Sequence, residues 1–305
     1  MMTLPHFIVI GAAKAGTVSL YHYLQQHPQI YMSPQNEPNF FALVGMDQAD
    51  WFHGPGDREN VRQQCVTELE PYKALFAGAQ KSQMAGEVSP VYLYSKSAPG
   101  QIKAHIPQVR LLVLLRQPAE RAFSHYQHFR RAGLEPEADF ARVIELEERR
   151  IRQGWGPIPM WHYVNMGFYA RQLQQYAQQF APNQMWVGLY DDFVVDPTAV
   201  LRQMFAFIGV DEAWEVDTAV QHNLGGQPRY TRLHQLMTRP NAIKSTFNWL
   251  IPPSLRYQLR DTVHQLNSPK PLLDDACRAR LNALYYEDIL ELQTMIGRDL
   301  SHWLT

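Results

Sequence analysis

The first twenty residues contain a predicted β-strand, a glycine loop and a helix in immediate succession. The apolar segment 7–10 leads into a loop that holds Gly11 and Gly16, and an amphipathic helical pattern follows. Glycines let a backbone approach a ligand closely, and the N-terminus of the next helix favours an anion. Lys14 adds a positive charge inside the loop. This order predicts an α/β fold with a phosphate-type site; the alternative is a tight strand–helix connection with a solvated lysine.

The loop departs from the two common nucleotide-binding sequences. A Walker A loop places its lysine directly after the second glycine, followed by a Ser or Thr that holds Mg²⁺. Here Thr17 and Val18 follow Gly16, and the lysine stands at position 14. The dinucleotide fingerprint G-x-G-x-x-G is absent as well. The loop therefore argues against a metal-dependent kinase or ATPase and against a nicotinamide-dependent Rossmann enzyme.

Strand and helix patterns alternate along the chain. Segment 109–115 is almost continuously apolar, which suits a central parallel strand covered on both faces. We therefore expect a single α/β domain over residues 1–305, with a P-loop-like central parallel sheet and helices on both faces. Further strands are expected within 30–32, 84–90 and 185–190, and helices over 119–129, 140–153, 169–180, 197–208 and 281–295.

Composition excludes several classes of protein. The chain has 28 Lys and Arg against 29 Asp and Glu, a net charge of −1, so it lacks the global basic field of a nucleic-acid-binding protein. Cys65 and Cys277 are its two cysteines and have no metal-ligand spacing. No segment approaches the roughly 20 apolar residues of a membrane span. We expect a soluble, cytoplasmic protein without a disulfide framework or metal; its oligomeric state stays open.

A second candidate anion site follows the 109–115 strand. Arg116 stands at the carboxyl end of that strand, where open α/β sheets bind ligands, and Ser124 lies on the helix that follows. A guanidinium can bind a phosphate through two nitrogens, and a serine can add a hydroxyl donor. An ion pair with Glu120 is the alternative role for Arg116. Two anion sites on one edge suggest a ligand with phosphates at both ends.

These motifs together resemble the sulfotransferases that use 3′-phosphoadenosine 5′-phosphosulfate (PAPS), in particular the bacterial members and the heparan-sulfate type. The segment Lys14–Tyr21 (KAGTVSLY) is similar to the family's 5′-phosphosulfate loop, K-x-G-T-T-S-L, with Val18 replacing the second threonine. Segment 116–126 is similar to the 3′-phosphate motif R-x-P-x-x-R-x-x-S-x-Y, and Glu37–Phe41 (EPNFF) to K-E-x-H/N-F-F. Asn36 stands where the last motif usually has a lysine.

The resemblance implies roles for individual residues. Glu37 would be the general base and Lys14 would stabilise the leaving phosphate, without a metal ion. Glu87 is a second candidate base, although a structural partner for a lysine or a backbone amide is at least as good an interpretation. His222 is a weaker candidate. The residues expected to bind PAPS, or its product PAP (3′-phosphoadenosine 5′-phosphate), are Lys14, Ala15, Gly16, Thr17, Val18, Ser19, Arg116, Ser124, Tyr169 and Arg229.

The sequence thus predicts transfer of a sulfuryl group from PAPS to a hydroxyl, less readily an amine, of a small-molecule or glycan acceptor. Two alternatives stay open: a P-loop-like kinase or nucleotide hydrolase, and a non-catalytic nucleotide-binding module. The acceptor itself is not predicted, because acceptor loops vary on a fixed scaffold.

Overall fold

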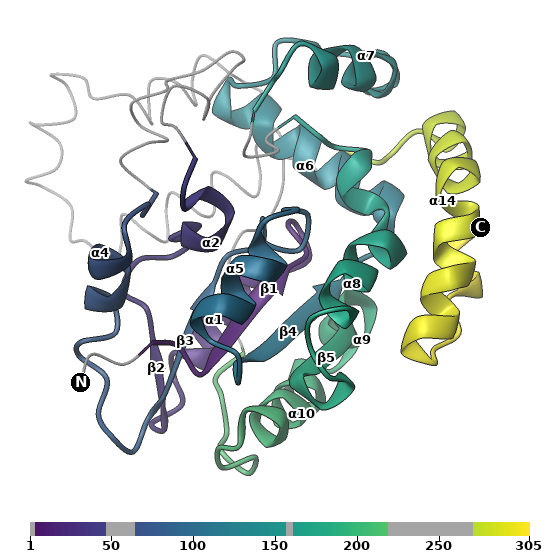
Figure 1. Ribbon diagram of the computed structural model, residues 1–305. Helices are drawn as coiled ribbons and strands as arrows, with labels where there is room; N and C mark the ends of the chain where they lie inside the picture. Colours follow the sequence, from purple (N-terminus) through teal and green to yellow (C-terminus); the bar gives the residue numbers. More distant parts are fainter. Residues whose placement is uncertain (1–3, 47–64, 157–160, 219–270) are drawn as a thin grey trace, which may run out of the picture. The chain divides into compact units, whose positions relative to one another are not determined.

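A computed structural model describes residues 4–46, 65–156, 161–218 and 271–305, whose strands form one parallel five-stranded sheet (Figure 1). The strand order is β2-β3-β1-β4-β5. Because all the strands are parallel, their carboxyl ends lie at one edge, where the loops after β1, β2 and β4 carry Lys14, Glu37 and Arg116. The strands are β1 (Phe7–Gly11), β2 (Ile30–Met32), β3 (Met84–Val88), β4 (Arg110–Leu115) and β5 (Met185–Leu189).

Strand β1 is the centre of the sheet. It pairs with β3 and with β4, so that Phe7 lies opposite both Gly86 and Arg110. A Cβ atom at Gly86 would stand 2.1 Å from the ring of Phe7, so the glycine makes room for that ring. The close pairing brings the ends of β1, β3 and β4 together.

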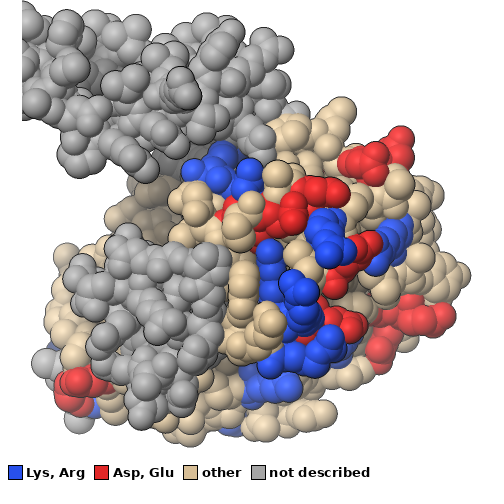
Figure 2. Space-filling view, turned by 90° about the horizontal axis from the view of Figure 1, so that it is seen from above, with Lys and Arg blue, Asp and Glu red and all other residues tan. Residues whose placement is uncertain are grey.

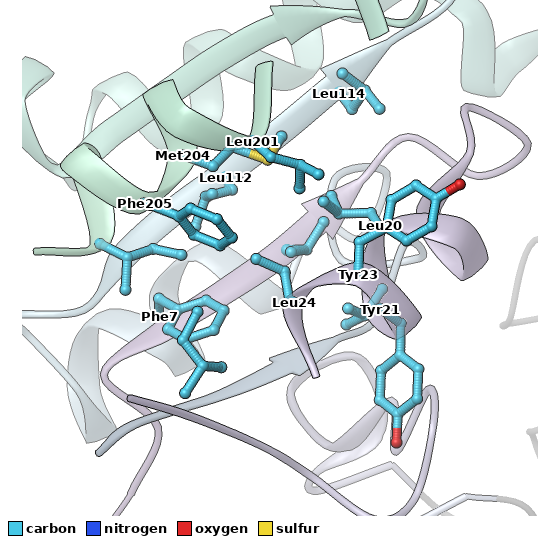
Figure 3. Close-up of a cluster of buried hydrophobic side chains, with 14 of the residues drawn as sticks. Phe7, Leu20, Tyr21, Tyr23, Leu24, Leu112, Leu114, Leu201, Met204 and Phe205 are labelled. Carbon is cyan, nitrogen blue, oxygen red and sulfur yellow. The ribbon is translucent and has the colours of Figure 1, made fainter. Parts of the chain in front are cut away.

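Helices cover both faces of the sheet, as the sequence predicts. On one face, Phe7, Leu112 and Leu114 pack against α1 and α10 in a buried cluster (Figure 3). The alternate residues Ile8 and Leu111 are also fully buried, so the opposite face is covered too. Burial on both faces explains the nearly continuous apolar run of β4.

The helices mostly follow the predicted patterns. The larger helices are α1 (Thr17–Leu24), α5 (Ala98–His105), α6 (Pro118–Ala132), α7 (Phe140–Arg152), α8 (Tyr169–Ala177), α10 (Pro197–Ile208) and α14 (Asp275–Ile296). The shorter ones are α2 (Phe40–Leu43), α4 (Leu69–Ala74) and α9 (Tyr190–Val195), with 3₁₀ turns η2 (Asn165–Gly167), η3 (Pro182–Gln184) and η4 (Ser301–Trp303).

Several elements differ from the sequence-based expectation, among them the short helix α9, which is not among the predicted helices. Helix α5 lacks a counterpart in the prediction, because Pro99 and Gly100 in its first turn resemble a loop. Helix α2 begins at Phe40, in a stretch outside the predicted helices. Helix α14 begins at Asp275, six residues before the predicted start.

The described residues belong almost entirely to one compact unit, Met1–His222 with Asp275–Thr305. A single domain over residues 1–305 stays a prediction. Within the described part of the chain, no helix combines the length and apolarity needed to cross a membrane. The predicted cytoplasmic location also stays a prediction.

Candidate active site

The loop between β1 and α1 has a backbone that requires glycine. Gly16 caps α1 with φ +85°, and a Cβ there would lie 2.9 Å from the ring of Tyr190. Lys14 also has a positive φ, of 67°, which is costly for a residue with a side chain. The α1 N-terminus supplies backbone N–H groups beside this loop. The structure therefore supports the predicted cradle for an anion.

Arg116 is joined to this loop by a hydrogen bond. Its Nη1 donates to the backbone oxygen of Lys14 at 3.3 Å, and its guanidinium carbon lies 5.1 Å from the centre of the Tyr190 ring. Tyr190 thus contacts both Arg116 and the space beside Gly16. The two candidate anion-binding motifs, about one hundred residues apart in sequence, are adjacent in the fold.

The alternative partner predicted for Arg116 is present as well. Arg116 Nη2 lies 3.5 Å from Glu120 Oε2, while Arg278 of α14 holds the other oxygen of Glu120 at 2.6 Å. All three side chains are partly exposed, so the Arg116–Glu120 pair is weak. Because two arginines share the one carboxylate of Glu120, the three side chains together keep a net positive charge.

Lys14 lies in a strongly cationic environment. Burial, followed by the positive charge of Arg131, lowers the pKa of the Lys14 amine to about 8, and Arg116 and Arg121 act in the same direction. Glu37 opposes this effect and raises the lysine pKa. A dianion placed among these cations would be strongly stabilised.

Glu37 lies on the segment between β2 and α2 and faces the same edge of the sheet. Its N–H donates to the backbone oxygen of Val88 at 3.1 Å, which fixes it beside the end of β3. Burial raises the pKa of the Glu37 carboxyl, while the charge of Lys14 lowers it. The mutual influence of the two groups places Lys14 and Glu37 within electrostatic reach of each other. A carboxylate with a raised pKa next to a cation is suited to accept a proton.

Glu87, the second candidate base, is fully buried beneath three hydroxyl groups among the described residues. Tyr72 donates to its Oε1 at 2.5 Å, Tyr92 donates to the same oxygen at 3.1 Å, and Ser89 donates to Oε2 at 2.7 Å. Burial raises the pKa of this carboxyl to about 7. Since the hydroxyls cover it, Glu87 is poorly placed to reach an acceptor.

Of the remaining predicted residues, most lie in the loop, in α1, in α6 or at the start of α8. Thr17 is buried in the first turn of α1, which also contains Val18 and Ser19, while Ala15 is buried before it. Ser124 lies on α6, two turns after the Arg116 loop. Tyr169 is fully buried and its hydroxyl donates to the Arg116 backbone oxygen at 2.8 Å, so it supports the arginine loop. Arg229 and His222 lie outside the described residues.

Sequence reasoning missed Arg131, Tyr190 and Arg278. Arg131 stands seven residues after Ser124 on α6, and this spacing, two helical turns, could have indicated a shared face. Tyr190 and Arg278 carry no such signal, because only the tertiary fold brings them to Arg116 and to its neighbour Glu120.

Comparison with known proteins identifies the family. The model of the family described as "Sulfotransferase domain" matches residues 4–225. The mouse (Mus musculus) heparan sulfate glucosamine 3-O-sulfotransferase 3B1 is 27% identical over 207 residues, which cover 68% of this chain and 46% of that protein. The human (Homo sapiens) bifunctional heparan sulfate N-deacetylase/N-sulfotransferase 3 is 26% identical over 217 residues, 68% of this chain and 22% of that protein.

A solved structure gives the same result over a longer stretch. The crystal structure of a sulfotransferase from Alicyclobacillus acidocaldarius matches with a TM-score of 0.76 and 30% identity, covering 99% of this chain and 100% of that one. The chain spans less than half the length of the two mammalian relatives. The family match and the shared fold confirm the resemblance predicted from the motifs, and the chain belongs to the sulfotransferase family.

Proposed function

We propose that this protein transfers a sulfuryl group from PAPS to a hydroxyl of a small-molecule or glycan acceptor, with Glu37 as general base and Lys14 stabilising the leaving phosphate. One observation carries the proposal: Lys14 and Glu37 influence each other's pKa at the edge of the sheet where the anion-binding loop begins α1. A cation for the leaving group and a base for the acceptor would thus lie within electrostatic reach of each other.

The donor set fits a ligand with phosphates at both ends. The loop at Gly16 offers backbone N–H groups and the Lys14 amine to the 5′-phosphosulfate. Arg116, joined to the loop through the Lys14 carbonyl, is the proposed ligand of the 3′-phosphate, and Ser124 of α6 is a second proposed ligand. PAPS would supply the activated sulfuryl group.

The chain's own residues account for the movement of proton and charge. Glu37 accepts the proton of the acceptor hydroxyl while the acceptor oxygen forms its bond to sulfur. As the bond between sulfur and the bridging phosphate oxygen breaks, the Lys14 ammonium meets the negative charge that develops on that oxygen. Atoms balance: the products are the sulfated acceptor, protonated Glu37 and PAP. The proposal does not require a metal ion.

The charge distribution bears on the class of acceptor. Figure 2 shows Lys and Arg side chains interspersed with Asp and Glu side chains on one face of the described protein. A long polyanion favours a surface with an unbroken positive charge. We therefore propose a small molecule or a short glycan, although the matched mammalian relatives are named for heparan sulfate.

Ligand-dependent thermal stability tests the donor. We expect PAP to raise the melting temperature in the presence of EDTA, and ATP with Mg²⁺ to leave it unchanged. A shift that appears only with ATP and Mg²⁺ would instead support a kinase or nucleotide hydrolase.

Transfer is tested with ³⁵S-labelled PAPS and a panel of hydroxyl acceptors: a phenol, a sterol, a disaccharide and a heparosan oligosaccharide, with an amine analogue for comparison. Label should move to a hydroxyl acceptor. If the protein binds PAP but transfers label neither to any acceptor of the panel nor to water, a non-catalytic nucleotide-binding module would be favoured.

A further inference from the structure

The buried carboxylate of Glu87 is connected to the segment that carries Glu37. Three hydroxyl groups donate hydrogen bonds to it, from Tyr72, Ser89 and Tyr92. We call these three residues and Glu87 the Glu87 network. Glu87 lies at the end of β3, its side chain is fully buried, and no described lysine or arginine forms an ion pair with it within 4 Å. A buried carboxylate without a cation is costly, so its presence calls for a reason beyond packing.

Two of the hydroxyl groups also accept hydrogen bonds from the backbone after Glu37. Ser89 donates to Glu87 and accepts the Asn39 N–H at 3.1 Å. Tyr92 donates to Glu87 and accepts the Phe41 N–H at 3.2 Å. Because the Ser89 and Tyr92 hydroxyls both donate their hydrogen bonds to the carboxylate, each hydroxyl oxygen has a lone pair left to accept from an N–H group of this segment.

The backbone held in this way is strained. Glu37 and Asn39 have φ angles of 56° and 57°, on either side of Pro38. A left-handed conformation at a residue with a long side chain costs on the order of 1–3 kcal/mol and persists only where the surroundings enforce it. The Glu37 N–H is bound by the Val88 carbonyl, and the Asn39 N–H by Ser89. These bonds fix the direction in which the Glu37 side chain leaves the backbone.

Tyr72 contacts both Glu87 and the segment that follows Glu37. Its ring stacks on Phe40 with a centroid distance of 4.5 Å and an interplanar angle of 15°, while its hydroxyl donates to Glu87. Tyr72 does not bond to the 37–41 backbone, however, so its hydroxyl can be removed without breaking the two connections through Ser89 and Tyr92.

We infer that Glu87 is a positioning residue: through Ser89 and Tyr92 it holds the strained segment 37–41, and thereby the carboxylate of Glu37, in the orientation that faces Lys14. This inference rests on the proposed function of Glu37 as the base. A carboxylate is required rather than an amide, because the side chain of the Glu87→Gln variant would turn an N–H₂ group toward hydroxyls that themselves donate.

The test uses the variants Glu87→Gln, Ser89→Ala and Tyr92→Phe of the full chain. Each should lower kcat by about tenfold to a hundredfold with the best acceptor of the panel, because small misplacements of a reacting group have effects of this size. The Kd for PAP, measured by calorimetry, should stay within about twofold, since the anion-binding loop and Arg116 are not contacts of the network. Amide hydrogen exchange in residues 37–41 of Glu87→Gln should accelerate at least about tenfold.

Two controls separate positioning from general destabilisation. Tyr72→Phe removes one donor to Glu87 but keeps the stacking on Phe40 and both connections through Ser89 and Tyr92, so its kcat should fall less than that of Ser89→Ala or Tyr92→Phe. Glu147→Gln changes another fully buried carboxylate, which accepts bonds from Val164 N and from Asn165 N and Nδ2. This variant should lose stability while exchange in residues 37–41 remains unchanged.

The outcomes distinguish this inference from the proposed function. If Glu37→Gln abolishes transfer but Ser89→Ala and Tyr92→Phe retain wild-type kcat, Glu37 is the base and the positioning role of Glu87 is wrong. If Glu37→Gln retains transfer, the proposed base is wrong. Unchanged exchange of residues 37–41 in folded Glu87→Gln would overturn the inference whatever the acceptor.

Discussion

The lowered pKa of Lys14 has a measurable consequence for ligand binding. Burial and the neighbouring cations bring the pKa from an ordinary 10.5 to about 8. This difference corresponds to about 3 kcal/mol of bias against the charged amine, on the order of 1.4 kcal/mol for each tenfold change. A bound 5′-phosphate carries negative charge and removes that bias, so it should raise the Lys14 pKa back toward its ordinary value.

Binding of PAP should therefore take up a proton above neutral pH. With a pKa of about 8, about three quarters of the free protein has a neutral Lys14 at pH 8.5, against about one tenth at pH 7. Since the bound form is charged at both values, the expected uptake is roughly 0.7 proton at pH 8.5 and roughly 0.1 at pH 7. The affinity should fall as the pH rises through 8, approaching tenfold for each pH unit.

Isothermal titration calorimetry in two buffers of different ionisation enthalpy measures this uptake directly. Lys14→Arg is the matched control, because a guanidinium remains charged and should show almost no uptake at pH 8.5. Wild-type protein that binds PAP without taking up a proton at pH 8.5 would contradict the expected protonation of Lys14 on binding. So would an unchanged uptake in Lys14→Arg, which would assign the proton to another group.

Three further predictions follow from the geometry. Gly16→Ala places a Cβ 2.9 Å from the Tyr190 ring at φ +85°, and we expect it to lower the unfolding free energy in urea by about 1–3 kcal/mol and to weaken PAP binding; unchanged affinity would contradict the cradle. Arg116→Ala should raise the Kd for PAP at least about tenfold in calorimetry and leave the Kd for 5′-AMP nearly unchanged; an equal loss of affinity for both nucleotides would argue against Arg116 as the ligand of the 3′-phosphate. Glu135→Ala should lower the free energy of unfolding in urea by about 3–5 kcal/mol, because it leaves the Arg150 guanidinium buried without its two hydrogen bonds at 2.8 and 2.9 Å. A decrease below about 1 kcal/mol would show that this ion pair contributes little to stability.

The sequence predicts the sheet and the adjacency of the two anion motifs well, for physical reasons. Strand β4 is apolar because both of its faces are covered, and Gly16 is required by a positive φ and a close ring, so both leave a clear local pattern. The position of Arg116 at the end of β4 places it at the ligand-binding edge of a parallel sheet, next to the loop after β1.

Other features depend on contacts between distant segments and leave no local pattern. Glu87 and Tyr72 are fifteen residues apart, and nothing in their sequence neighbourhood indicates a shared hydrogen bond. Arg278 reaches Glu120 across 158 positions. The predicted start of α14 is too late because the first turns of this helix expose charged residues, and α5 escapes prediction because Pro99 and Gly100 mask its helical pattern.

Single-turnover transfer by Glu37→Gln is the most direct test of the central claim, that Glu37 accepts the acceptor's proton while Lys14 stabilises the leaving phosphate. Enzyme loaded with ³⁵S-labelled PAPS is mixed with the acceptor identified by the panel, and the transfer rate is compared with the wild type and with Glu137→Gln, a surface carboxylate on another loop. We expect the transfer rate of Glu37→Gln to be at least about a hundredfold lower, with its PAP affinity within about twofold of the wild type and the rate of Glu137→Gln unchanged. A Glu37→Gln protein that transfers sulfate at the wild-type rate would contradict the central claim.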